Sequence, residues 1–258
     1  MRNGYCFVAS VKVVWLVTAV HLAGCTTDGH TVLDNKPATN PLASFINIEL
    51  TLAPYLAEMI DEKRALADQL SMTWGAGVSV VNTESAKATK VTNCQQFFSA
   101  ESKGMEPVNA FEFFPYRTIG LQCIAISLLS TMNNASKSYL GDFSLDLSLT
   151  KQLPTEFAFI ISSTEEKDIR ENSKLSRWSD VYNIESVESL NKEKAVYKVL
   201  GGDQELTVLA RGDFNHDNIE DILVRLTNTV TEGSYTSTRL FLLTKLGLEG
   251  EIRLLKAY

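Results

Sequence analysis

The sequence predicts an α+β fold in which N-terminal helices pack on a C-terminal antiparallel β-meander. Apolar residues recur at helical spacing between residues 51 and 72, and an apolar segment long enough for a helix covers residues 116–132. From residue 195 onward, strand-like runs of six to ten residues alternate with turns that contain glycine. Helices followed by a series of strands are typical of the α+β class.

The first 24 residues have the pattern of a cleavable export signal. Arg2 and Lys12 supply positive charge, and residues 13–20 (VVWLVTAV) form an apolar run too short to cross about 30 Å of hydrocarbon. The sequence Leu-Ala-Gly-Cys follows and ends at Cys25. It resembles the lipobox of bacterial lipoproteins, in which the cysteine is diacylated and becomes the first residue of the mature chain. The alternative is an ordinary signal peptide followed by an incidental cysteine.

The resemblance implies a lipid-anchored protein of the cell envelope. Residues 25–42 are polar, contain one glycine and two prolines, and lack apolar periodicity, so we expect a flexible tether. Residues 43–258 are expected to form a single α+β domain. Thr26, and not aspartate, follows the cysteine, which in this family favours the outer membrane. The body of the protein is then expected to face the periplasm.

The charge of the mature chain narrows the range of partners. Removal of residues 1–24 leaves 22 basic and 31 acidic residues, a formal charge of −9. A chain of this charge is repelled by phosphate backbones and by anionic lipid surfaces. Nucleic acid is therefore not an expected partner, and membrane attachment is expected through the lipid chains on Cys25.

Two cysteines, Cys94 and Cys123, remain in the predicted domain, because Cys6 leaves with the signal and Cys25 carries lipid. Disulfides persist in an exported compartment. A bridge between the two would close a loop of about 30 residues and would stabilise the fold by about 3–4 kcal/mol. The alternative is a pair of buried free thiols.

The helices and first strand of the domain follow from local patterns. The segment 51–72 has one apolar face and carries Pro54 in its first turn, so we expect an amphipathic helix. A strand is expected at Val78–Val81, after Gly-Ala-Gly. Residues 116–132 are apolar nearly all round, with Pro115 just ahead, and are expected to form the central buried helix.

Three segments between this helix and the meander are predicted less uniformly. The pattern of residues 139–148 favours neither helix nor strand. Residues 156–162 (EFAFIIS) form an apolar run that predicts a strand. Residues 164–172 are highly charged and indicate a solvated loop or a short helix.

An acidic segment, GDFNHDNIEDILV at residues 212–224, separates two of the predicted strands. Oxygen-bearing side chains occupy its metal-loop positions 1, 3, 5 and 9, which are Asp213, Asn215, Asp217 and Asp221. Ca²⁺ prefers six to eight oxygen ligands at about 2.3–2.6 Å. A loop curled around the ion would add the carbonyl of Ile219. Position 6 needs a tight turn, often with positive φ, and Asn218 tolerates that conformation better than most residues.

The flanks of this segment exclude an EF-hand and point to another kind of loop. An EF-hand needs a bidentate glutamate at position 12, where this chain has Val224, and it needs helices on both sides. The segment instead resembles the calcium loops of FG-GAP and related repeats, which read GDFNGDGxxDLV and link two adjacent strands. His216 and Asn218 replace the two inner glycines. The resemblance occurs once, so it implies a structural calcium ion but no propeller. The alternatives are an acidic turn without metal and a loop that binds another metal ion.

No sequence pattern of a known catalytic site is present. The chain lacks Gly-x-Ser-x-Gly, a phosphate loop, a dinucleotide fingerprint and His-Glu-x-x-His. Glu112 stands among Phe111, Phe113 and Phe114, and we interpret it as the exposed face of an amphipathic segment and not as a catalytic carboxyl.

The sequence therefore favours a non-enzymatic envelope lipoprotein that binds a protein partner. By analogy with other small anchored lipoproteins, it would be an inhibitor of a toxic or lytic enzyme. The alternative is a hydrolase of envelope polymers that uses two carboxylates, which the sequence alone does not identify.

Overall fold

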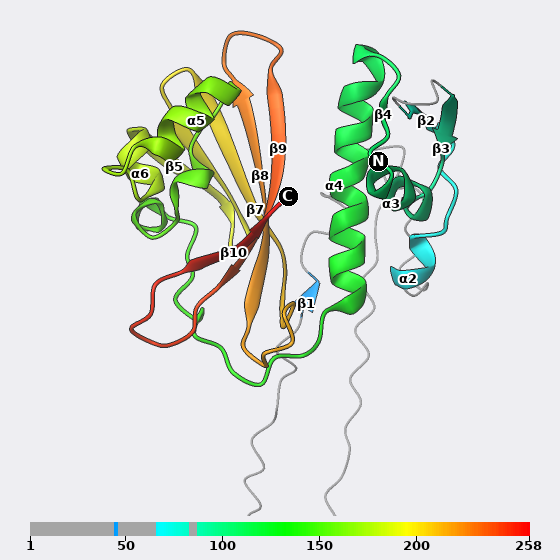
Figure 1. Cartoon of the computed structure of the whole chain (residues 1–258). Helices are drawn as coiled ribbons and strands as arrows, with labels where there is room; N and C mark the ends of the chain where they lie inside the picture. Colours follow the sequence, from blue (N-terminus) through cyan, green and yellow to red (C-terminus); the bar gives the residue numbers. More distant parts are fainter. Residues whose placement is uncertain (1–43, 46–65, 83–86) are drawn as a thin grey trace, which may run out of the picture. The chain divides into compact units, whose positions relative to one another are not determined.

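A computed structural model describes residues 44–45, 66–82 and 87–258 (Figure 1). The C-terminal part of these residues forms a large antiparallel sheet, which confirms the predicted α+β class. Neighbouring strands run in the order β10-β9-β8-β7-β6-β5, and β1 also pairs with β7. The strands are β1 (Ser44–Phe45), β5 (Ile184–Asn191), β6 (Lys194–Val199), β7 (Gly202–Gly212), β8 (Asp221–Val230), β9 (Thr236–Thr244) and β10 (Arg253–Ala257).

The pattern of burial along the strands explains which of them the sequence predicted. In β6, the buried Ala195, Tyr197 and Val199 alternate with half-buried residues, as expected for side chains that point to opposite faces. The sheet nevertheless begins before residue 195, because β5 precedes it. Most residues of β5 are exposed, since it is an edge strand, and it therefore lacks the apolar alternation that marks the other strands.

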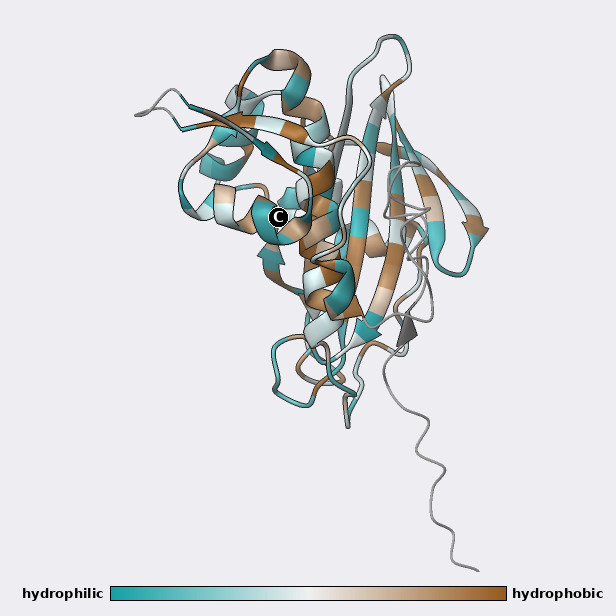
Figure 2. Cartoon of the chain, turned by 90° about the vertical axis from the view of Figure 1, so that its right-hand side faces the viewer, coloured by the Kyte–Doolittle hydropathy of each residue, from teal (hydrophilic) through white to brown (hydrophobic). Residues whose placement is uncertain are grey.

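Both faces of the large sheet are covered. On one face lies the chain between residues 140 and 182, which contains η2 (Leu147–Lys151), η3 (Thr155–Phe157), α5 (Ser163–Glu171) and α6 (Trp178–Val181). On the other face, α4 (Ala110–Thr131) packs Leu121, Ala125 and Leu129 against β7, β8 and β9. Figure 2 shows hydrophobic residues along both α4 and these strands. The central strands are therefore buried on both sides.

The predicted strand over residues 156–162 is wrong. The structure has the short helix η3 there, followed by an irregular segment, and Phe157 and Ala158 are fully buried. The carbonyls of this segment are not paired in a ladder. Gln204 Nε2 donates to the Phe157 carbonyl at 2.9 Å, and Arg239 Nη2 donates to the Ala158 carbonyl at 2.9 Å. Side chains from the sheet thus satisfy backbone groups that a strand would satisfy with a neighbour.

Gln204 joins several buried groups and should be sensitive to substitution. Besides bonding Phe157, it accepts from Trp178 Nε1 at 3.0 Å and donates to Asn228 Oδ1 at 2.9 Å. Replacing Gln204 with leucine is expected to lower the free energy of unfolding by about 2–3 kcal/mol, because several buried polar groups lose their partner. Urea denaturation measures the loss. The matched control is Gln152→Leu on the surface, and equal stability of the two variants would contradict the role of this network.

The central helix α4 begins six residues earlier than predicted. Asn109 caps it, because its Oδ1 accepts from the backbone N–H groups of Phe111 and Glu112 at 2.9 and 3.2 Å. Pro115 therefore lies inside the helix and not ahead of it. The cap moves the start of the helix upstream and brings three phenylalanines into its first five residues.

On its second side, α4 packs against a smaller unit of helix and sheet. This unit contains β2 (Val78–Val81), β3 (Ala88–Val91), α3 (Cys94–Ser102) and β4 (Glu106–Pro107), with strand order β3-β2-β4. The strand predicted at Val78–Val81 is confirmed. Cys94 at the start of α3 forms a disulfide with Cys123 of α4, and both cysteines are buried.

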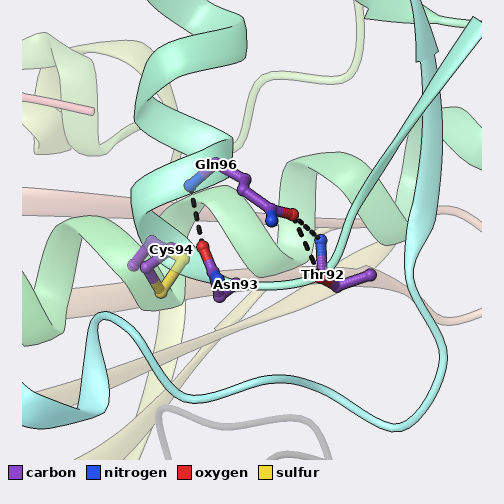
Figure 3. Close-up of a disulfide and its surroundings, with 5 residues drawn as sticks. Thr92, Asn93, Cys94 and Gln96 are labelled. Atoms are coloured by element: carbon purple, nitrogen blue, oxygen red, sulfur yellow. Dashed lines mark hydrogen bonds between the residues drawn. A yellow bond between two sulfur atoms is a disulfide. The ribbon is translucent and has the colours of Figure 1, made fainter.

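The start of α3 is built by side-chain caps next to this disulfide (Figure 3). Asn93 Oδ1 accepts from the Gln96 N–H at 2.8 Å, and Gln96 Oε1 accepts from the Thr92 N–H at 2.8 Å. The two bonds satisfy backbone donors on both sides of Cys94 and hold it at a fixed point of the chain.

Several predictions fall partly or wholly outside the described residues. Of the helix expected at 51–72, the structure describes α2 (Leu66–Gln69), and residues 46–65 lie outside it. The export signal, Cys25 and the tether also lie outside. Of the two interpretations of residues 164–172, α5 confirms the short helix. Within the described part of the chain, none of the helices is long and apolar enough to cross a membrane.

Candidate metal site in the loop between β7 and β8

The acidic segment lies between two neighbouring antiparallel strands, as predicted. Strand β7 ends at Gly212 and β8 begins at Asp221, and these two residues are partners in the ladder. Residues 213–220 form the connection. The sheet therefore fixes both ends of the loop, and Asp213 and Asp221 emerge side by side from paired strands.

The backbone of the loop turns sharply at the two positions where the FG-GAP pattern has glycine. His216 has a φ of 66° and Asn218 a φ of 67°. Asparagine was expected to accept this left-handed conformation at position 6, and it does. Histidine at position 4 also adopts it, although the conformation is uncommon for residues other than glycine. The loop thus takes the turn that a calcium loop requires without either glycine.

Backbone N–H groups of the loop converge on the carboxylates. Asp213 is buried, and its two oxygens accept from the N–H groups of Asp217 and Asn218 at 3.1 and 2.9 Å. Asp217 Oδ1 accepts from the Ile219 N–H at 2.8 Å. Asn215 contacts Asp217 twice, through its Oδ1 to the backbone N–H and through its Nδ2 to Oδ2. The four residues Asp213, Asn215, Asp217 and Ile219 are therefore brought together by the turn.

Asp221 is placed differently, because its carboxylate is fully buried and only half satisfied. Oδ2 accepts from the Phe214 N–H at 3.0 Å, whereas Oδ1 is buried without a hydrogen-bond partner. Burial raises the pKa of Asp221. Thr244 stands opposite Asp221 in the β8–β9 ladder. Its hydroxyl lowers the pKa of Asp221 and so offsets part of the rise. Thr244 Oγ1 and Asp221 Oδ1 nevertheless do not meet the geometry of a hydrogen bond. The charges of Asp217 and Asp213 raise the pKa further.

Residues 133–137, which follow α4, form backbone hydrogen bonds to the loop. The backbones of Asn133 and Asp213 exchange two hydrogen bonds of 2.9 Å. The Asn218 carbonyl accepts from the N–H groups of Ser136 and Lys137. A Cβ atom at Gly212 would lie 2.4 Å from Met132 Sδ and 3.1 Å from the Asn133 carbonyl, so a larger residue would force this segment to shift. Both ends of the loop are therefore buried and tied to the segment after α4, while residues 215–218 at its tip are exposed.

A calcium ion suits the kind of donor present here. The loop offers oxygen ligands, the preferred ligands of Ca²⁺, and the orphaned buried Oδ1 of Asp221 is a group that a cation would satisfy. Among the described residues, however, no group of three or more His, Cys, Asp or Glu side chains is placed to hold a metal ion. Calcium in this loop therefore remains a prediction.

A second surface feature, at the N-terminus of α4, was not predicted. Phe111, Phe113 and Phe114 are 91, 58 and 62% exposed, and Val108 beside them is 36% exposed. Glu112 is half-buried. The interpretation of Glu112 as the exposed face is therefore wrong, because the phenylalanines face the solvent. We call Val108, Phe111, Phe113 and Phe114 the aromatic patch.

A recess of about 420 Å³ lies beside β9. The residues that bear on its chemistry are Arg117, Glu156, Ser162, Glu166, Thr238 and Arg239. They come from α4, η3, the N-terminus of α5 and β9, which are far apart in the sequence. Sequence patterns give no signal for such a site, because only the tertiary fold brings these residues together. We call it the β9 recess.

Comparison of the chain with protein-family models, with curated proteins and with solved structures finds no match in any of the three.

Proposed function

We propose that the chain is a cell-envelope lipoprotein, anchored through lipid on Cys25, that binds a protein partner and catalyses no reaction. One calcium ion in the loop between β7 and β8 would stabilise the sheet. The aromatic patch carries the proposal. Contiguous exposed apolar side chains are uncommon on soluble proteins and mark sites of association. Aromatic residues are also enriched among the anchors of protein interfaces.

The aromatic patch lies at the end of α4 away from the point where the expected tether joins the domain. The patch lies at the N-terminus of α4, whereas the C-terminal end of α4 leads to Asn133 beside the acidic loop. Strand β1, the first described after the expected tether, pairs with Ala210 and Arg211 near that loop (Figure 1). A helix of 22 residues is about 33 Å long. The patch is therefore separated from β1, where the expected tether joins the domain, by about the length of α4.

A carboxylate-dependent hydrolase has one observation in its favour, because Glu156 and Glu166 line the same β9 recess. Both side chains are exposed. A general acid of a glycosidase relies on an apolar setting to keep its proton. Binding is therefore the better-supported function.

Substituting the aromatic patch is expected to abolish capture of the partner. The triple variant Phe111→Ser, Phe113→Ser, Phe114→Ser should keep the melting temperature of the wild type, since all three rings are exposed. It should lose at least about tenfold in binding, the scale expected for removing aromatic anchors. Chemical crosslinking in envelope extract, followed by mass spectrometry and titration of the captured protein, measures the effect.

The matched control is Leu248→Ser, which removes another exposed apolar side chain, 76% accessible, in the connection between β9 and β10. It should bind like the wild type. Retention of the partner by the triple variant, or the absence of any crosslinked protein that the wild type enriches, would refute the proposed function.

A further inference from the structure

The segment that follows α4 crosses the acidic loop and pairs with it at two points. We call residues 133–138 the strap. Asn133, its first residue, forms an antiparallel bridge with Asp213, and Lys137 forms a parallel bridge with Ile219. These two loop residues occupy metal-loop positions 1 and 7. The strap therefore holds the loop at one predicted side-chain ligand and at the predicted carbonyl ligand.

Three hydrogen bonds from the strap converge on the Asn218 carbonyl. Its oxygen accepts from the N–H groups of Ser136 and Lys137 at 3.0 and 3.2 Å, and from Ser136 Oγ at 3.1 Å. The N–H of Asn218 donates in a different direction, to Asp213 Oδ2 at 2.9 Å. The left-handed backbone of Asn218 thus links the strap to a predicted ligand.

The strap also orients the peptide groups on both sides of Ile219. Lys137 donates to the carbonyl that precedes Ile219 and accepts from the N–H that follows it, that of Glu220, at 2.8 Å. Parallel pairing of this kind uses the neighbours of a residue and turns its own N–H and C=O to the opposite side. The Ile219 N–H accordingly donates to Asp217 Oδ1 at 2.8 Å. The Ile219 carbonyl therefore also faces the loop, as a ligand of Ca²⁺ would.

A separate observation points to a cation in the loop. The carboxylate of Asp221 is fully buried, and its Oδ1 has no hydrogen-bond partner among the described residues. Its Oδ2 accepts from the Phe214 N–H, which belongs to the loop, so the carboxylate faces the loop. A buried carboxylate oxygen without a partner is costly, and a bound cation would remove that cost.

We propose that the strap positions the ligands of the calcium site, with Ser136 and Lys137 as positioning residues that hold Asn218 and Ile219. This rests on the proposed function, because it assumes the calcium ion. Of the predicted ligands, none lies in the strap, so the strap acts through the backbone of the loop. Coupling between two parts of a protein is reciprocal. Calcium should therefore hold the strap in turn, and with it the C-terminal end of α4.

Isothermal titration calorimetry of the full chain with Ca²⁺ tests this inference. Ser136→Pro removes both the N–H and the hydroxyl that donate to the Asn218 carbonyl. It should weaken calcium binding by about tenfold or more, the scale seen when groups that orient metal ligands are lost. Ser136→Ala, which removes only the hydroxyl, should weaken binding by a smaller factor, and Ser136→Thr should restore it. The matched control is Asn134→Ala, at an exposed neighbour in the strap, which should bind like the wild type.

Two further measurements separate positioning from damage to the fold. In chelator, Ser136→Ala should melt at the wild-type temperature, since this residue is exposed, and only its gain in calcium should be smaller. Hydrogen exchange followed by mass spectrometry reports on the strap. Saturating calcium should slow exchange in the wild-type strap by the same factor of about ten, and Ser136→Pro should lose this protection. Exchange in α5, on the opposite face of the sheet, should not change.

The inference is overturned if a folded Ser136→Pro variant binds calcium as tightly as the wild type. It is also overturned if calcium binds the wild type without slowing exchange in the strap. Ser136→Ala keeps the test decisive if the proline variant unfolds, because wild-type affinity of the alanine variant would likewise overturn the inference.

Failure of this inference differs from failure of the proposed function. Equal calcium binding by the wild type and the Ser136 variants would remove the role of the strap and keep the calcium ion. A wild-type chain that binds no calcium would remove both the strap inference and the calcium part of the proposed function. Capture of a protein through the aromatic patch depends on neither result.

Discussion

Removing the Cys94–Cys123 disulfide is expected to lower the free energy of unfolding by about 3–4 kcal/mol. The bridge joins cysteines that are 29 positions apart in the sequence. Breaking it increases the conformational entropy of the unfolded chain and so favours unfolding. It also holds α3 on α4. A helix of nine residues is marginal by itself. The packing is tight here, because a Cβ at Gly120 would lie 2.6 Å from the ring of Phe97.

Urea denaturation of three samples checks this expectation. They are the oxidised wild type, the wild type with a phosphine reductant, and the variant Cys94→Ala with Cys123→Ala. The reductant should shift the wild-type midpoint close to that of the variant and leave the variant unchanged. Amide hydrogen exchange should accelerate first in α3. An oxidised and a reduced wild type with the same midpoint would show that core packing, and not the bridge, secures this part of the fold.

The sequence predicts elements well where burial alone decides them. The meander follows from strands such as β6, whose burial alternates along the chain. Prediction from the sequence fails where side chains, and not a neighbouring strand, form the hydrogen bonds to backbone carbonyls. Residues 156–162 have the apolar composition of a strand, but Gln204 and Arg239 reach the carbonyls of Phe157 and Ala158 and remove the need for a ladder. These two hydrogen bonds join residues that are 47 and 81 positions apart in the sequence, so the local pattern of residues 156–162 does not reveal them.

The candidate site shows the same division. The spacing of the acidic loop and the left-handed turn at Asn218 were predictable, because both are local properties of the backbone. The orphaned Oδ1 of Asp221 was not, since it results from packing between β8 and its neighbours. The exposure of Phe111 was also unpredictable. A phenylalanine is usually buried, whereas the cap at Asn109 starts the helix so that Phe111 stands in its first turn, where it is 91% exposed.

Calcium is expected to stabilise the chain. The effect of Asp221→Asn on stability should therefore have opposite signs with and without calcium. A ligand that binds only the folded state at 100 times its dissociation constant adds about 2.7 kcal/mol. Thermal melting in chelator and in excess Ca²⁺ measures this gain. In calcium, Asp221→Asn should reduce the gain, because the neutral side chain is a poorer ligand.

In chelator, the same substitution should stabilise the chain by about 1 kcal/mol, the size of one net hydrogen bond, since the introduced amide has an N–H to offer to the unpaired Thr244 hydroxyl. The pKa of Asp221 is raised in the folded state. A carboxyl with a raised pKa contributes stability below its unfolded pKa and loses that contribution as the pH rises through the folded value. Asp221 therefore contributes less stability at neutral pH than at acidic pH, and the amide, which does not titrate, avoids that loss. In chelator, the part of the pH dependence of stability that Asp221 contributes should be absent from Asp221→Asn.

Asp213→Ala separates this effect from simple damage to the loop. Both oxygens of Asp213 accept backbone N–H groups, so its loss should destabilise the chain by about 1–3 kcal/mol with or without calcium. If the loop binds calcium, Asp221→Asn stabilises in chelator and destabilises in calcium, while Asp213→Ala destabilises in both. If the loop is a metal-free turn, added Ca²⁺ changes neither the wild type nor the variants, and Asp221→Asn is stabilising throughout. The effects have opposite signs because the buried Asp221 side chain destabilises the chain without calcium and is a ligand of the ion when calcium is bound.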